Sequence, residues 1–136
     1  MNLVKISLEA EGYYSEATYK EDIMITKESY EIIKEDVDNL DLYIYELDGK
    51  HSETEGDISI DEFTEEELLK EHFPNDNDGD TLYDHLDDIF EKYNLKLDDE
   101  LDMINKYVSK LDTMIIMEIS VKKSQKEKVL EFISKL

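Results

Sequence analysis

The chain has 136 residues, of which 37 are acidic and 15 are basic, and its formal net charge at pH 7 is −22. Every basic residue is a lysine, and there is no cysteine. The composition therefore excludes disulfides, thiolate metal sites and cysteine nucleophiles. It also lacks the bidentate clamp that arginine provides for phosphate or carboxylate groups.

The length indicates one domain over residues 1–136, because a chain of this size can bury a hydrophobic core by itself. No stretch approaches the roughly 18 apolar residues of a membrane span, and residues 1–12 lack the apolar segment of a secretory signal. The abundance of lysine, isoleucine and acidic residues is typical of AT-rich genomes, such as those of low-GC bacteria and their phages. We expect a cytoplasmic protein of a bacterial host, with no membrane association.

The first third of the chain predicts two strands and a helix. Apolar residues alternate in residues 2–10 and 22–26, as they do in half-buried strands. Thr26 is a suitable N-cap for a helix over residues 27–37, in which Tyr30, Ile33 and Val37 share one face.

A second pair of strands is predicted over residues 40–47 and 56–61. In the first of these, Leu42 and Ile44 would face one way and Tyr43 and Tyr45 the other. A strand that is apolar on both faces is expected at the centre of a sheet. Residues 48–55 would form the hairpin connection, with Asp48-Gly49 supplying its turn.

Three helices are predicted in the region that follows. A capping box at residues 64–67 opens a short helix that ends near residue 72. Asp80 or Thr81 would cap a helix that ends near Tyr93, and apolar spacing predicts another helix over residues 97–111.

The chain ends with a predicted strand over residues 113–121 and a helix opened by a second capping box at residues 124–127. Together these elements predict an α+β fold in a single domain. We expect a mainly antiparallel sheet of about five strands covered by four to five helices.

The negative charge is concentrated in the middle of the chain. Residues 35–102 contain 26 acidic residues and only four lysines, whereas residues 1–34 and 103–136 are close to neutral. Charge of this density repels nucleic acid and anionic membranes and attracts basic partners.

The predicted helix over residues 80–93 shows this excess most clearly. Its expected buried stripe consists of Leu82, Leu86, Ile89 and Tyr93. A second stripe is entirely acidic: Asp80, Asp84, Asp87, Asp88 and Glu91. Each like-charged pair one turn apart disfavours the helix by about 0.2–0.5 kcal/mol, so the stripe costs roughly 1–2.5 kcal/mol. Such violations of local rules tend to mark function.

Metal sites fit the sequence poorly. Residues 74–85 resemble a calcium loop, with Asp76 and Asp78 before Gly79, but Pro74 and His85 occupy the positions of the first and last carboxylate ligands. The histidines at positions 51, 72 and 85 do not recur at the spacing that places two imidazoles on one helix face. We therefore expect no metal or cofactor.

Enzyme motifs are equally sparse, since there is no glycine-rich phosphate loop and no nucleophile elbow. The acid-x-Lys pattern Asp48-Gly49-Lys50 at a strand end resembles a nuclease pair, but it also suits a tight turn. A nuclease with this net charge would repel its own substrate. No catalytic residue is expected.

The acidity favours a protein inhibitor that occupies the basic groove of a nucleic-acid-binding protein, such as a nuclease or a CRISPR effector. In size, charge and composition the chain resembles the nucleic-acid mimics that phages use against host defence, such as anti-CRISPR and anti-restriction proteins. The expected binding residues are the carboxylates of Asp57, Asp61, Glu62, Glu65, Glu66, Asp76, Asp78, Asp80, Asp84, Asp87, Asp88, Glu91, Asp98, Asp99 and Asp102.

Three alternatives stay open. An immunity protein or antitoxin that neutralises a cationic toxin would use the same acidic surface. A divalent-metal-binding protein or metal-dependent enzyme would use Asp76, Asp78, Asp80 and Asp84. An acidic adaptor would instead bind its partner through tyrosines on or beside the strands, because exposed tyrosines are good interface anchors. The oligomeric state does not follow from the sequence.

Overall fold

The computed structural model describes residues 2–64 and 80–110. The chain divides into two compact units, Met1–Ile104 and Asn105–Leu136. The strand predicted over residues 113–121, the helix opened at residues 124–127 and the short helix that would end near residue 72 lie outside the described residues.

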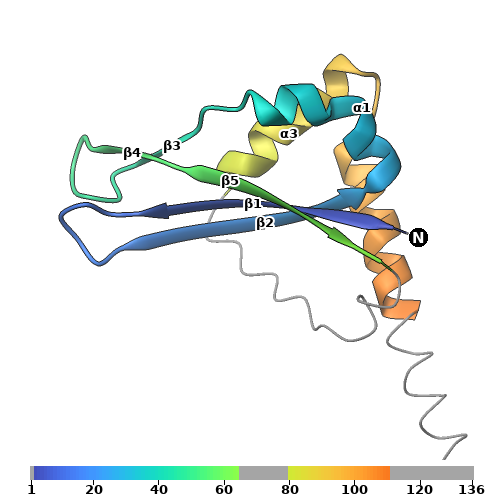
Figure 1. Ribbon diagram of the computed structural model, residues 1–136, viewed down its shortest axis with the longest axis horizontal. Coiled ribbons are helices and arrows are strands. Elements are labelled where there is room, and N and C mark those ends of the chain that lie inside the picture. The colour runs from blue at the N-terminus through green and yellow to red at the C-terminus, as the bar shows by residue number, and fades with distance from the viewer. Residues whose placement is uncertain (1, 65–79, 111–136) are drawn as a thin grey trace, which may run out of the picture. The chain divides into compact units, whose positions relative to one another are not determined.

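A three-stranded antiparallel sheet forms the base of the fold (Figure 1). Its strands are β1 (Leu3–Glu11), β2 (Thr18–Thr26) and β5 (Asp57–Phe63), in the order β2-β1-β5. Alternate residues of β1, from Val4 to Ala10, are buried against the helices. The remaining residues of β1 therefore point to the other side of the sheet, which we call the outer face.

Two helices cover the inner face of the sheet together (Figure 1). Helix α1 (Lys27–Asp38) begins at Thr26, whose hydroxyl accepts a hydrogen bond from the backbone N–H of Ser29 at 3.2 Å. The predicted cap and helix are thus confirmed. Ile33 and Val37 are the buried residues of α1 and join the isoleucines of β2 in the core.

Helix α3 (Thr81–Lys92) is the second of these helices, and it confirms the helix predicted over residues 80–93. Its fully buried residues are Leu82, Leu86 and Phe90. Ile89 and Tyr93 of the predicted stripe pack against the core but are only half-buried, whereas Phe90, which was predicted beside the stripe, is fully buried. Phe90 lies four residues after Leu86, and its larger ring fills the core position.

A further helix begins at residue 97 and includes residue 110, the last that the structure describes. Leu97 and Ile104 are buried on it. Glu100 anchors it to α1, because its Oε1 accepts hydrogen bonds from the backbone N–H of Thr26, at 3.1 Å, and from the Thr26 hydroxyl. The position of this helix is therefore linked to the start of α1.

The predicted central strand over residues 40–47 was wrong. Only three of its residues form a strand, β3 (Tyr43–Tyr45), which pairs with β4 (Glu53–Glu55) in a separate two-stranded sheet. Glu46 has a positive φ of 62°, which ends the extended backbone there. Ile44 is buried, whereas Tyr43 and Tyr45 are exposed, so this strand buries only one face.

The predicted architecture was therefore wrong in its number and arrangement of elements. The fold is α+β, as expected, but the described residues form a three-stranded sheet, a two-stranded sheet and three helices. They do not form one sheet of five strands under four to five helices. No helix among the described residues is long and apolar enough to cross a membrane.

Candidate acidic interface

The acidic stripe of α3 lies on the side of the helix that faces away from the core. Asp84, Asp88 and Glu91 are exposed, and Asp87 is half-buried. They share the helix with Leu82, Leu86 and Phe90, which are completely buried. The apolar contacts thus hold the helix in place and leave its carboxylates open to solvent.

No lysine neutralises this stripe within the described part of the chain. The one basic residue of α3, Lys92, forms its ion pair with Asp36 of α1 at 3.0 Å. His85 is also engaged locally, since its Nδ1 lies 2.8 Å from the carbonyl oxygen of Thr81. Among the described residues, no ion pair with a lysine thus offsets the like-charge repulsion predicted from the sequence.

Tyr83 connects the stripe to the next helix. Its hydroxyl donates a hydrogen bond to Asp98. This bond, partial burial and the negative charges of Asp98, Asp87 and Asp84 raise the pKa of Tyr83 to about 12. Three predicted site residues from two helices thus influence one phenol, and Asp98 contacts it directly. Asp99 and Asp102 are exposed on the same second helix as Asp98.

A buried carboxylate that the sequence analysis missed fixes the start of α3. Glu21 on β2 has no exposed surface, and its two carboxylate oxygens accept hydrogen bonds from the backbone N–H groups of Leu82, at 2.8 Å, and Tyr83, at 2.9 Å. The hydroxyl of Tyr19 donates a third bond at 2.6 Å. A negative group at a helix N-terminus is favoured by the helix dipole.

Glu21 thereby replaces the predicted cap. Asp80 occupies the N-cap position, but its side chain makes no capping hydrogen bond. The only sequence signal for this role was the alternation of inward-facing residues along β2, which places Glu21 on the same side as Ile23 and Ile25. The pairing of the strands confirms this side, because Glu21 lies opposite Leu8. An acid at a buried strand position needs donors, and the start of α3 supplies them.

The acids of β5 do not join the stripe of α3. Asp57 pairs with Glu9 of β1, and Asp61 pairs with Lys5. Directly opposed residues point to the same side of a sheet, so both aspartates lie on the outer face, whereas α3 covers the inner one.

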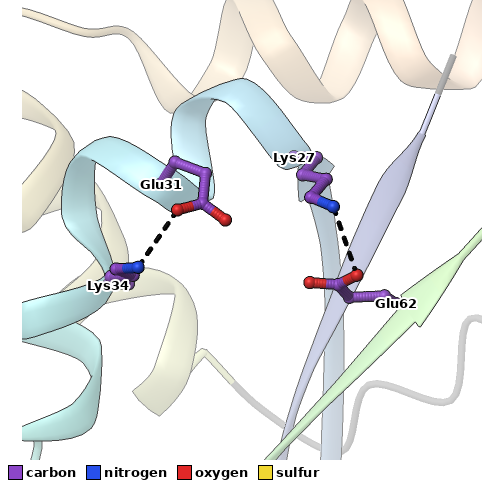
Figure 2. A network of polar contacts seen from close by, with 4 residues as sticks. All are labelled: Lys27, Glu31, Lys34 and Glu62. Carbon is purple, nitrogen blue, oxygen red and sulfur yellow. Dashed lines mark hydrogen bonds and ion pairs between the residues drawn. The ribbon is translucent and has the colours of Figure 1, made fainter.

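Glu62 forms an ion pair with Lys27 at the start of α1, and a second, separate ion pair joins Lys34 to Glu31 on the same helix (Figure 2). Lys27 lies 3.4 Å from Glu62, and Lys34 lies 3.1 Å from Glu31. Glu62 is therefore neutralised by a neighbouring lysine, unlike the acids of α3. Glu65, Glu66, Asp76 and Asp78 lie outside the described residues.

Asp48 has a structural role. Its carboxylate accepts hydrogen bonds from the backbone N–H groups of Tyr13, Tyr14 and Ser15 at 2.8–3.2 Å and from the hydroxyl of Thr54 at 3.2 Å. These bonds lower its pKa. A Cβ on Gly12 would collide with this carboxylate. The aspartate of the acid-x-Lys pattern thus holds the β1–β2 loop against the β3–β4 hairpin.

A metal site and a ligand-binding cavity are less well supported by the structure than the acidic surface of α3. Within residues 2–64 and 80–110, no three side chains of His, Asp or Glu are placed to hold a metal ion. A cavity of about 510 Å³ opens beside the start of α1, where Thr26, Lys27, Glu31 and Met103 contribute to its wall. Its lysine and Glu31 already have ion-pair partners.

Comparisons of the chain with protein-family models, with curated proteins and with solved structures found no match.

Proposed function

We propose that this protein is an acidic inhibitor of a nucleic-acid-binding protein and that the stripe of α3 occupies the partner's basic groove. The observation that supports this proposal is the set of exposed or half-buried carboxylates on α3 that form no ion pair with a lysine of residues 2–64 or 80–110. Asp98 extends the set from the next helix through Tyr83. The proposal centres the surface on α3 and leaves the outer-face aspartates of β5 outside it.

The charge density of the stripe is comparable to that of one DNA strand. An α-helix rises about 1.5 Å per residue, so Asp84, Asp87, Asp88 and Glu91 span about 10.5 Å along the axis, or roughly 3.5 Å per charge. A strand of B-DNA has one negative charge for about every 3.4 Å of axis. A groove whose Lys and Arg side chains are spaced to bind a DNA strand would therefore also suit the acidic stripe of α3.

The rigidity of the stripe also favours this role. The buried stripe of α3 packs in the core, and Glu21 fixes its first turn. Carboxylates on a helix that is already folded cost less conformational entropy when a partner docks than those of a segment that folds on binding. A mimic of a stiff polyanion needs such order.

The test is affinity capture from a bacterial lysate on the immobilised full-length protein, with elution by a salt gradient. We expect one nucleic-acid-binding protein to be retained, to elute at raised salt because the contacts are ionic, and to be displaced by duplex DNA. Retention that neither salt nor DNA disturbs would contradict the proposal.

A further inference from the structure

The exposed face of the β3–β4 hairpin alternates tyrosine and glutamate. Tyr43 lies opposite Glu55, and Tyr45 lies opposite Glu53. The residues between them, Ile44 and Thr54, are buried on the other side of the hairpin. We call the four outward residues the Tyr–Glu ladder.

The ladder is open to solvent. Tyr43 is 40% exposed and Tyr45 is 70% exposed, although tyrosine rings usually bury most of their surface. Within the described residues neither Glu53 nor Glu55 forms an ion pair. The negative charges of Asp41 and Glu55 raise the pKa of Tyr43, so this ring lies in a field that attracts cations.

We propose that the Tyr–Glu ladder binds an arginine side chain of a protein partner. Residues two apart on a strand are separated by about 6.6 Å, which is roughly twice a van der Waals contact distance of about 3.5 Å. A planar guanidinium therefore fits between the two tyrosine rings. Its N–H groups point outward in the plane and can donate to the carboxylates opposite.

Arginine suits this site better than lysine for a geometric reason. The guanidinium is flat, stacks on aromatic rings and donates two parallel hydrogen bonds to one carboxylate. An ammonium is compact and strongly hydrated, so it gains from the carboxylates but gains less than a guanidinium from a slot between two rings. The ladder is thus a site for one kind of cation rather than a general acidic patch.

The hairpin that presents the ladder is held in place. The hydroxyl of Ser52 accepts from the backbone N–H of Asp48 at 3.1 Å and donates to the carbonyl of Gly49 at 2.7 Å. The Asp48 carboxylate binds the neighbouring loop, as described above. The hairpin therefore presents its four side chains without folding on binding, which limits the entropy lost in the complex.

This inference goes beyond the proposed function and does not depend on the stripe of α3. Its test compares two peptides of equal length and charge, one of Arg-Gly-Gly repeats and one of Lys-Gly-Gly repeats, by calorimetry at physiological salt. We expect the wild-type full chain to bind the arginine peptide about five- to tenfold more tightly, because a guanidinium stacks on the two rings more favourably than a hydrated ammonium does.

The critical variant is Tyr43→Leu with Tyr45→Leu, which removes the rings and keeps every charge. We expect both peptides to bind this variant with equal affinity. Its matched control is Tyr13→Leu with Tyr14→Leu, since these tyrosines are 87% and 94% exposed but lie outside the ladder. The control should keep the full preference for arginine.

Two results would overturn the inference: equal binding of the two peptides by the wild type, or an arginine preference that survives loss of both ladder tyrosines. A Tyr43→Phe with Tyr45→Phe variant, which keeps the rings and the fold, should retain the preference. A variant with the α3 carboxylates neutralised should keep it too, so failure of the ladder and failure of the proposed inhibitor function are distinguishable.

Discussion

Glu21 illustrates how a single buried acid positions the candidate interface. Its carboxylate accepts three hydrogen bonds, two from backbone N–H groups in the first turn of α3 and one from the Tyr19 hydroxyl. All three bonds lie in or near the core, where an unmet donor costs more than it does in water. The residue therefore links the sheet to the helix that bears the acidic stripe.

We predict that Glu21→Ala lowers the free energy of unfolding by about 2–3 kcal/mol, because it leaves two helix N–H groups and a hydroxyl without their acceptor. Urea denaturation measures the change. Glu11→Ala, on the exposed end of β1, is the control and should change stability by less than about 0.5 kcal/mol. Equal effects of the two substitutions would refute the capping role.

The hydrogen bonds of Asp48 are expected to make the stability of the β1–β2 loop depend on pH. Its pKa is lowered in the folded protein by the N–H groups of Tyr13 and Tyr14. Its stabilisation is therefore complete above the unfolded-state pKa of about 3.9 and is lost as the pH falls through the folded-state value.

We expect the amide resonances of Tyr13 and Tyr14 to move with a midpoint below that of a free aspartate when the protein is titrated by NMR. Asp48→Asn should abolish this transition and speed hydrogen exchange at both amides. A transition that persists in the variant would mean that another group controls the loop.

The contact between α3 and the next helix predicts an alkaline transition. The pKa of Tyr83 is about 12, above the usual value of 10.0. Since the folded-state value is the higher one, the stabilisation from the protonated phenol is complete below the unfolded-state pKa and is lost as the pH rises through the folded-state value.

Asp98→Asn should lower the pKa of Tyr83 toward that of free tyrosine, as followed by NMR of ring carbons. Asp99→Asn is the matched control on the adjacent position and should leave the phenol unchanged. Equal shifts in the two variants would show that general charge, rather than the Asp98 hydrogen bond, controls Tyr83.

The acidic stripe itself should destabilise α3. Neutralising four of its five members (Asp84→Asn, Asp87→Asn, Asp88→Asn and Glu91→Gln) is expected to raise the free energy of unfolding by roughly 1 kcal/mol, because like-charged pairs one turn apart are removed. The gain measured by urea denaturation should shrink in 1 M salt, where these charges are screened. A loss of stability would contradict the geometry described for the stripe.

Local patterns predicted the helices better than the sheet. Thr26 and the residues after it contain a cap and one apolar face, so the position of α1 follows from adjacent residues. The cap of α3 comes from Glu21, about sixty residues earlier, and no local pattern predicts it. The prediction of a central strand over residues 40–47 was wrong because its tyrosines were counted as buried apolar residues, whereas Tyr43 and Tyr45 face solvent.

The candidate interface was predictable in the same partial way. The spacing of the α3 acids placed them on one helix face, which the structure shows. The sequence could not separate them from Asp57 and Asp61, because only the pairing of β5 with β1 assigns those residues to the outer face. The net charge of the chain therefore does not show that these acids lie on two separate surfaces.

Among the described residues, α3 and the outer face of the sheet thus each present at least four acidic side chains. This division allows two variants of equal net charge. One is the four-residue α3 variant described above, and the other changes four outer-face acids: Glu9→Gln, Glu11→Gln, Asp57→Asn and Asp61→Asn. General electrostatic attraction would respond equally to both, since each removes four charges.

The most direct test of the proposed function is the dissociation constant of each variant for the protein captured from lysate. We predict that the α3 variant binds at least about 100-fold more weakly than wild type, as loss of several charged contacts implies. The outer-face variant should stay within about threefold of wild type. Equal weakening of the two, or no weakening in the α3 variant, would contradict the assignment of α3 as the binding surface.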